Sequence, residues 1–293
     1  MRSRKMTVWQ WLNALLMLSV LIITLYPFLY VFANSVSDPI ATVKNEVYLW
    51  PVGFQLKTYS QLLRSNDLLT SYYNTIWYTI VGTLVSTFVV LMAAYPLSRK
   101  EFCLRRPLNT IFLVTMYFSG GIVPIYITIN RLGLYDTRWA IILPVACNVY
   151  NMIVARTYFE TIPEGLIESA KLDGANDLVI FNRIVIRLSK SVIAVLVLFA
   201  AVSYWNTYLN AVLYLPSSEL QPLQMFLYKL LVQGLSNATG NSGAAGQMSL
   251  ERSMNVTQYK YAAIILTVLP IVFVYPFVQK HFVKGVMIGA VKG

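Results

Sequence analysis

Residues 11–33 read WLNALLMLSVLIITLYPFLYVFA and contain no charged side chain. The hydrocarbon core of a bilayer is about 30 Å thick, and a helix needs about 20 apolar residues to cross it. This stretch is therefore predicted to span a membrane. Arg2, Arg4 and Lys5 precede it, as they would in a signal peptide, but its apolar run exceeds the roughly 7–15 residues of such a leader. We interpret it as a retained span.

Five more stretches have the same character. They cover residues 74–97, 108–130, 139–158, 191–213 and 261–278, and a charged residue occurs only near an end, as Arg156 does. A large soluble helix bundle is the alternative, but such a bundle would not need six uncharged stretches of membrane-spanning length. The expected fold class is an all-α polytopic membrane protein with six transmembrane helices, and residues 1–293 are expected to form a single domain.

The composition excludes several other classes. Hydrophobic residues make up 57% of the 293 residues and charged residues 12%, against about 25% in soluble domains. The net charge of +11 does not indicate a nucleic-acid partner, because the basic residues lie between apolar runs and not in a polar chain. Cys103, Cys147 and the single His281 leave little for a metal site, and we expect both thiols to be unpaired.

Lysine and arginine predict the orientation in the lipid bilayer, because cytoplasmic loops are enriched in both. With the N-terminus inside, 15 of the 23 basic residues fall on the cytoplasmic side. Both termini and the loop over residues 159–190 are then cytoplasmic. Residues 34–73 and 214–260 become outer loops.

The cytoplasmic loop contains TIPEGLIESAKLDGAN at residues 161–176. Thr161 and Glu164 have the spacing of a capping box and Pro163 suits a first turn, so a helix is expected to begin here. It should run to Leu172 and end before Gly174, because glycine readily adopts the left-handed conformation that follows a helix. A second helix should start at residue 176 or 177.

The first of these helices has more apolar residues than so short a helix can bury by itself. They are Leu166, Ile167, Ala170 and Leu172. The residues alone leave two interpretations open. Either a partner protein covers this surface, or the helix lies on lipid headgroups.

Residues 168–175, ESAKLDGA, followed by Phe181 and Ile184, resemble the E-A-A…D-G-A loop of permeases of ATP-binding cassette (ABC) importers. In that family the loop is a coupling helix that docks into a cleft of the cytosolic ATPase. The resemblance implies that Glu168 pairs with a basic residue of the ATPase and that Gly174 forms the turn. Alanines in the loop would allow close approach. The implied coupling residues are Glu168, Ser169, Ala170, Asp173, Gly174 and Ala175.

The loop departs from the family pattern in three places. Ser169 replaces an alanine, and Arg187 and Ser191 stand where prolines are usual. Serine is nearly as small as alanine, so the resemblance still implies docking. The missing prolines affect the entry into the fifth span.

Further segments resemble the maltose-type carbohydrate permeases, over about 220 residues from Asn74 onward. They are AAYPLSR at 93–99, PIY at 124–126, LGLYDT at 132–137, YWNTY at 204–208, and FVKG and GAVKG at 282–285 and 289–293. FSGGIVP at 118–124 resembles a narrower branch that imports oligosaccharides, among them uronate glycans such as pectin fragments and alginate.

The resemblance implies one permease subunit of a carbohydrate importer in the bacterial plasma (inner) membrane. A second, homologous permease subunit would pair with it, with two ATPase subunits below and an extracytoplasmic solute-binding protein above. The sequence has no G-x-x-x-x-G-K-[ST] phosphate loop. No cofactor is therefore expected on this chain, and ATP and magnesium are expected on the ATPase subunits.

Three other functions are alternatives. An ABC permease for a different solute fits the same coupling loop. A secondary transporter usually has ionisable groups at mid-membrane depth and a repeat pair, and neither is evident here. A membrane enzyme could use Ser119 or Cys147, but His281 lies at the far cytoplasmic end.

The fifth expected span contains the candidates for a substrate passage. They are Tyr204, Trp205, Asn206, Tyr208 and Asn210. Asn206 and Asn210 are four residues apart and would share one helix face. Aromatic rings and amides suit sugars, but the same residues commonly hydrogen-bond neighbouring helices instead. Packing between helices is therefore the alternative role.

The outer loop over residues 214–260 includes a segment, 234–246, that is rich in Gly, Ser, Asn and Ala. Such a composition is flexible in isolation. The resemblance implies that this loop reaches into the solute-binding protein and helps to dislodge the sugar. A plain connection is the alternative.

Overall fold

The computed structural model describes residues 7–239 and 257–273, and no residue within these ranges forms a strand. The expected all-helical class is confirmed for this part of the chain. The described residues divide into two compact units, one within residues 1–65 and 227–270 and one within residues 66–226 and 271–293. Helix α14, Leu223–Thr239, belongs to both. The C-terminal motifs at 282–293 and most of the segment 234–246 lie outside the described residues.

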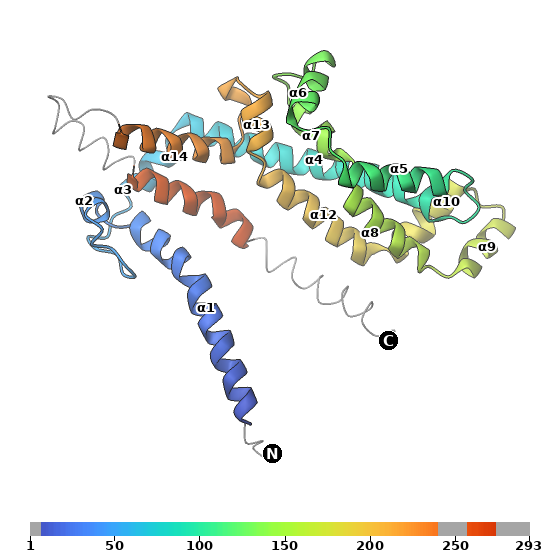
Figure 1. Cartoon of the computed structure of the whole chain (residues 1–293), viewed down its shortest axis with the longest axis horizontal. Helices are drawn as coiled ribbons and strands as arrows, with labels where there is room; N and C mark the ends of the chain where they lie inside the picture. The colour runs from blue at the N-terminus through green and yellow to red at the C-terminus, as the bar shows by residue number, and fades with distance from the viewer. Residues whose placement is uncertain (1–6, 240–256, 274–293) are drawn as a thin grey trace. The chain divides into compact units, whose positions relative to one another are not determined.

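Helix α1, Val8–Ser35, covers the first expected span and is drawn in dark blue in Figure 1. It begins after Thr7, whose backbone N–H donates to the side-chain oxygen of Gln10 at 2.9 Å. Its apolar side chains are exposed along most of its length, and only the C-terminal residues 33–35 are buried. A long uncharged helix with this much exposed apolar surface suits a lipid environment.

The rest of the first unit is joined by hydrogen bonds between distant parts of the sequence. It contains α2 (Pro39–Val43), α3 (Lys57–Leu63) and most of a helix over Thr257–Phe273. The buried side chain of Gln258 accepts a hydrogen bond of 2.6 Å from the Thr58 hydroxyl and donates to the Ser37 carbonyl. These bonds satisfy both ends of a buried amide, which would be costly to leave unpaired.

The second unit is built around α4, Asn66–Ser98, which packs against α7, α8 and α12. Its other helical elements are α5 (Arg105–Tyr117), α6 (Ile122–Arg131), α7 (Trp139–Ala146), α8 (Val149–Glu160), α9 (Glu164–Leu172), α10 (Asp177–Ile180), the π-helix η1 (Phe181–Val185), α11 (Ile186–Leu188), α12 (Lys190–Trp205), α13 (Leu209–Tyr214) and the 3₁₀ helix η2 (Ser218–Leu220). The main core cluster includes Val90, Ala94, Met152, Phe159 and Leu196, all buried.

A close helix contact fixes the middle of this unit. Gly82 of α4 faces the ring of Tyr204 of α12, and a Cβ atom at Gly82 would lie only 2.7 Å from the ring carbons. The Tyr204 hydroxyl donates to the Ile142 carbonyl of α7 at 3.1 Å. Small residues at helix interfaces permit this approach of one backbone to a neighbouring ring.

Two of the expected spans are each made of two helices. The expectation of a continuous helix over 108–130 is wrong, because α5 and α6 meet at 115°. In Figure 1, α6 turns away from the line of α5. The chain turns through Gly121, whose φ of +84° is accessible to glycine at little cost. In the expected span 139–158, α7 and α8 meet at 45°, and Asn148 caps α8 by accepting from the Asn151 backbone N–H at 2.9 Å.

The fifth expected span, 191–213, is also interrupted. Helix α12 ends at Trp205 and α13 begins at Leu209. Among the described residues, α1 and α4 are long and apolar enough to cross a membrane, and up to five spans result if each bent pair is one span. The sixth expected span is described only to Phe273. The six-span topology therefore stays a prediction.

Candidate functional site

The loop between α8 and α12 begins differently from the sequence expectation. The predicted capping box is wrong, because Thr161 ends α8 and its hydroxyl donates to the Tyr158 carbonyl at 2.7 Å. Pro163 stands at the N-cap position of α9, and the helix proper starts at Glu164. Thr161 is thus used by the preceding helix, so α9 has no side-chain cap at its N-terminus.

The end of α9 agrees with the expectation. The helix ends at Leu172, and Gly174 follows with a φ of +80°. The Ala175 N–H donates to the Ala170 carbonyl at 2.9 Å, which closes the turn. Asn176 then caps α10 by accepting from the Val179 N–H at 2.9 Å. The predicted arrangement of helix, glycine turn and second helix is confirmed.

Helix α9 buries one face and exposes the other. Ile167 is buried in the core cluster that also contains Phe159 and Ile180. Leu166 is 47% exposed and Leu172 is 89% exposed. The exposed leucines therefore leave an apolar surface at the outer side and the C-terminal end of α9 that nothing within the described chain covers.

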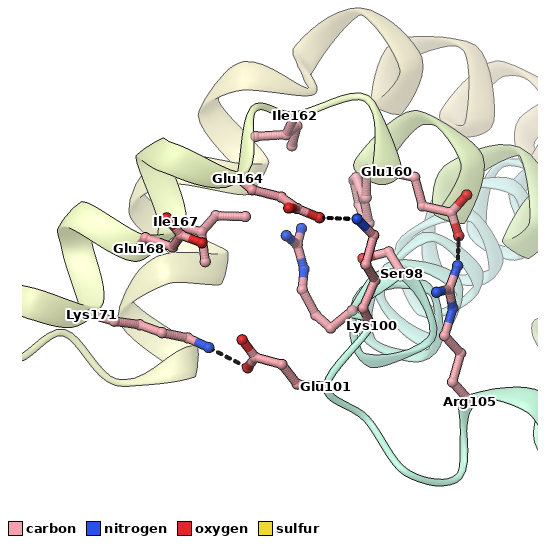
Figure 2. A pocket seen from close by; sticks show the side chains of 12 residues that line it. Ser98, Lys100, Glu101, Arg105, Glu160, Ile162, Glu164, Ile167, Glu168 and Lys171 are labelled. Carbon is pink, nitrogen blue, oxygen red and sulfur yellow. Dashed lines mark hydrogen bonds and ion pairs between the residues drawn. The ribbon is translucent and has the colours of Figure 1, made fainter.

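Ion pairs connect α9 and the end of α8 to the turn between α4 and α5. The Lys100 ammonium lies 2.5 Å from a Glu164 carboxylate oxygen, and Lys171 pairs with Glu101. Figure 2 shows both pairs, together with the pair between Arg105 and Glu160 at 2.6 Å. Arg105 also donates from its Nε to the Leu97 carbonyl at the end of α4, at 3.0 Å. The α4–α5 turn is thus paired with α9 near both ends of that helix.

These groups surround a hollow of about 240 Å³, here called the coupling hollow. It is lined by Ser98, Arg99, Lys100, Glu101, Arg105, Phe159, Glu160, Ile162, Glu164, Ile167, Glu168 and Lys171. The Lys100 ammonium, by hydrogen bond and by charge, holds the pKa of Glu164 below its usual range. The hydrogen bond to Glu101 raises the pKa of Lys171. Both pKa shifts favour the charged forms of Glu164 and Lys171.

The predicted coupling residues lie together on α9 and the turn that follows. Glu168 lines the coupling hollow and makes no ion pair within the described residues. The Ser169 hydroxyl donates to the Gly165 carbonyl at 2.7 Å, so its polar group is satisfied within the helix. Ala170 and Ala175 pack against the core cluster, and Asp173 is the C-cap residue. A carboxylate without a cation on this segment is free to meet one from outside the chain.

The predicted passage residues are divided by the break after α12. Tyr204 and Trp205 are buried, and Tyr204 packs between α4 and α7. The expectation that Asn206 and Asn210 share one helix face is wrong, because Asn206 is the C-cap residue of α12 whereas Asn210 belongs to α13. The Asn206 amide donates to the Val202 carbonyl at 2.9 Å, a bond within its own turn.

A second hollow near Tyr204, here called the polar pocket, contains residues that the sequence reasoning missed. It has a volume of about 360 Å³ and is lined by Ser86, Val145, Asn148, Tyr150, Asn151, Phe199, Ala200, Ser203 and Tyr204. The sequence feature that could have indicated this pocket is the presence of two amides, Asn148 and Asn151, within an otherwise apolar stretch. Polar residues at such positions commonly face the interior of a helix bundle or a water-filled cavity.

Comparisons with known proteins identify the family of the chain. The family described as binding-protein-dependent transport system inner membrane component matches residues 77–288. The polygalacturonan/rhamnogalacturonan transport system permease protein YtcP of Bacillus subtilis (strain 168) is 39% identical over 272 residues, 93% of this chain and 94% of that protein. Protein LplC of the same organism is 40% identical over 271 residues, 92% of this chain and 90% of that protein.

A solved structure is also similar. A chain in the crystal structure of a bacterial ABC transporter involved in the import of the acidic polysaccharide alginate superimposes with a TM-score of 0.85. It is 35% identical, and the match covers 96% of this chain and 99% of that one. The family match and both relatives extend over most of the sequence. The chain therefore belongs to the family of inner membrane components of binding-protein-dependent transport systems.

Proposed function

We propose that the chain is a permease subunit of an ATP-driven importer for oligosaccharides that contain uronate residues. The observation that carries this proposal is the 39% identity, over 93% of the chain, to a permease for polygalacturonan and rhamnogalacturonan. The similarity to a chain of an alginate importer supports it independently, because alginate is likewise an acidic polysaccharide. No ionisable mid-span residue of the kind that ion-coupled carriers use appears in the sequence.

Helix α9 and the turn at Gly174 serve as the coupling segment in this proposal. The uncompensated carboxylate of Glu168 and the exposed Leu172 offer a charge and an apolar contact to the ATPase. Closure of two ATPase subunits on ATP and magnesium would move this segment as a rigid body, together with the α4–α5 turn to which it is paired. Docking of the solute-binding protein would be coupled to the same motion reciprocally.

The polar pocket is the proposed part of the passage on this subunit. Its lining offers the amides of Asn148 and Asn151 and the hydroxyls of Tyr150 and Ser203, and none of its described lining residues is charged. Such groups suit sugar hydroxyls, for which they can both donate and accept hydrogen bonds. Neutralisation of the uronate carboxylates is assigned to the second, homologous permease subunit.

The proposed topology follows from the charges and the apolar helices. Six spans in one permease domain would place both termini and residues 159–190 on the cytoplasmic side of the bacterial inner membrane. The bent pairs α5–α6 and α7–α8 are then one span each. The outer loop over 214–260 is the proposed contact with the solute-binding protein.

Uptake by the purified importer tests this function. The permease is reconstituted in vesicles with its partner permease, ATPase and solute-binding protein, and ATP-dependent uptake is measured. Oligogalacturonates should be taken up and maltose oligosaccharides of the same length should not. Uptake of neutral sugars alone would contradict the uronate assignment, and a stimulated ATPase with no sugar uptake would indicate a different solute.

A further inference from the structure

A third hollow is formed by the α4–α5 turn and the beginning of α5. It is an open groove of about 1000 Å³, here called the basic groove. It is lined by Lys100, Phe102, Cys103, Arg105, Arg106, Asn109 and Thr110. Three of these side chains are cationic and none is a carboxylate. The charges of the groove therefore favour binding of an anion.

The basic groove lies where two membrane segments meet the water. Helix α4 ends at Ser98 and is a candidate membrane span by itself. Helix α5 begins at Arg105 and is the first half of another apolar segment of spanning length. The short turn between them must therefore lie at a surface of the membrane, at the level of the phospholipid headgroups. This placement holds whichever side of the membrane the turn faces.

The charges around the basic groove leave Arg106 uncompensated. Lys100 and Arg105 pair with Glu164 and Glu160, and these two carboxylates line the coupling hollow and not the groove. Arg106 is exposed and makes no ion pair in the part of the chain that the structure describes. The first turn of α5 contains no acidic residue, so the positive end of the helix dipole adds to the same field.

We propose that the basic groove binds the headgroup phosphate of an anionic phospholipid of the surrounding membrane. Arginine holds phosphate oxygens with two parallel N–H donors, and a membrane surface supplies the phosphate at high local concentration. Asn109 and Thr110 offer uncharged polar groups beside it. Lys100 and Arg105 line both the basic groove and the coupling hollow, so a bound phosphate competes for the cations that hold the coupling segment.

Cys103 provides a direct probe because it is an exposed thiol in the lining of the basic groove. The complete importer is reconstituted in vesicles of phosphatidylcholine, with or without phosphatidylglycerol. Alkylation of Cys103 is followed by mass spectrometry of its peptide. Phosphatidylglycerol should slow the alkylation in the natural protein. The variant Arg106→Gln should need about five times more phosphatidylglycerol for the same protection, the effect of one basic residue near a membrane surface.

The matched control is Arg183→Gln, since Arg183 is an exposed arginine of the same unit that does not line the groove. Both variants lose one charge and meet the same membrane, so a general effect of surface potential acts on them equally. Equal protection in the two variants would overturn the proposal. Protection by inorganic phosphate in phosphatidylcholine vesicles would assign the groove to a free anion and not to lipid. Protection of Cys103 in phosphatidylcholine vesicles without any added anion would assign the groove to a partner subunit. This result and protection by inorganic phosphate would each overturn the lipid assignment.

Discussion

Two glycines of the second unit are required for different physical reasons. Gly82 lies against the ring of Tyr204, where a side chain has no space, and Gly174 has open space but a φ of +80°. Gly82 is required by packing, and Gly174 is required by its backbone conformation. Their substitutions should accordingly affect different properties.

Gly82→Ala should destabilise the fold. Its new Cβ would lie 2.7 Å from the Tyr204 ring, so α4 or α12 must shift, and overpacking of this kind costs about 1–3 kcal/mol. The midpoint of thermal unfolding of the purified protein in detergent measures the effect. Gly165→Ala is the control, because a Cβ there meets nothing within 4 Å. Equal midpoints for the two variants would show that the close contact does not exist.

Gly174→Val should uncouple ATP hydrolysis from uptake and leave the second unit folded. The left-handed conformation costs a β-branched residue about 1–2 kcal/mol or more, so the turn after α9 should change. Uptake and ATPase activity of the reconstituted importer are measured together. Gly174→Asn should be milder, since asparagine tolerates this conformation. Normal uptake in the valine variant would contradict the coupling role of this turn.

At the scale of the helix, α9 is attached to the α4–α5 turn mainly by exposed ion pairs. The Lys100–Glu164 pair is one of them, and its side chains are 76% and 63% exposed. Exposed pairs of this kind are weak and are screened by salt. Within the core, α9 contributes one buried side chain, Ile167, and the partly buried Ala170 packs against the same cluster. Helix α9 is thus an element that a partner can move without unfolding the rest of the unit.

The acid sensitivity of this attachment can be measured. The pKa of Glu164 is lowered in the folded protein, so the pair with Lys100 holds above the ordinary glutamate pKa of about 4.3 and is lost as the pH falls through the lowered value. The pKa of Lys171 is raised, so in alkaline solution its pair with Glu101 persists until the pH rises above the ordinary range of lysine. Between these limits both pairs should hold.

A fluorophore attached at exposed position 172, through Leu172→Cys after both natural cysteines are replaced, reports the motion of α9. Its anisotropy should stay constant at neutral pH and fall only in acid, below the ordinary glutamate pKa, because the pKa of Glu164 is lowered. In Glu164→Gln the anisotropy should already be lower at neutral pH. The acid transition that comes from the pair of Lys100 and Glu164 should be absent. A transition of the same size in both proteins would assign it to another group.

At the scale of the whole molecule, the breaks in the expected spans determine where polar groups are placed. The break between α7 and α8 puts Asn148 and Asn151 at the polar pocket, and the end of α12 puts Ser203 and Tyr204 there. These residues come from helices far apart in the sequence. The proposed passage at the polar pocket would thus depend on interrupted helices.

Ser203→Phe should block the polar pocket. The larger ring would fill part of the 360 Å³ and remove a hydroxyl, so sugar uptake should fall several-fold while the coupling segment remains intact. Stimulation of the ATPase by the loaded binding protein should persist. Val202→Phe is the matched control, because Val202 is exposed on α12 and does not line the pocket. Equal uptake in both variants would remove the polar pocket from the proposed passage.

The sequence by itself determined the features that depend on local order. Long uncharged stretches predict helices of membrane-spanning length because their backbone must be satisfied within each segment. Gly174 and Asn176 predicted the end of α9 and the start of α10 correctly, since the conformation of a turn is set by the residues in it. The residues of the coupling segment could be identified in the same way, because they are contiguous in the sequence. Their roles in coupling stay predictions.

Only the tertiary structure decided which of two helices uses a shared capping residue and which residues distant in the sequence come into contact. Thr161 could cap either neighbouring helix, and the structure gives it to α8. A hydropathy pattern does not indicate where a helix bends or ends. The spans predicted from it therefore did not include the 115° turn between α5 and α6 or the end of α12 at Trp205. The three ion pairs that hold α9 and the end of α8 join residues between 55 and 70 positions apart. No local pattern encodes such pairs, because packing of α4 against α8 brings their charges together.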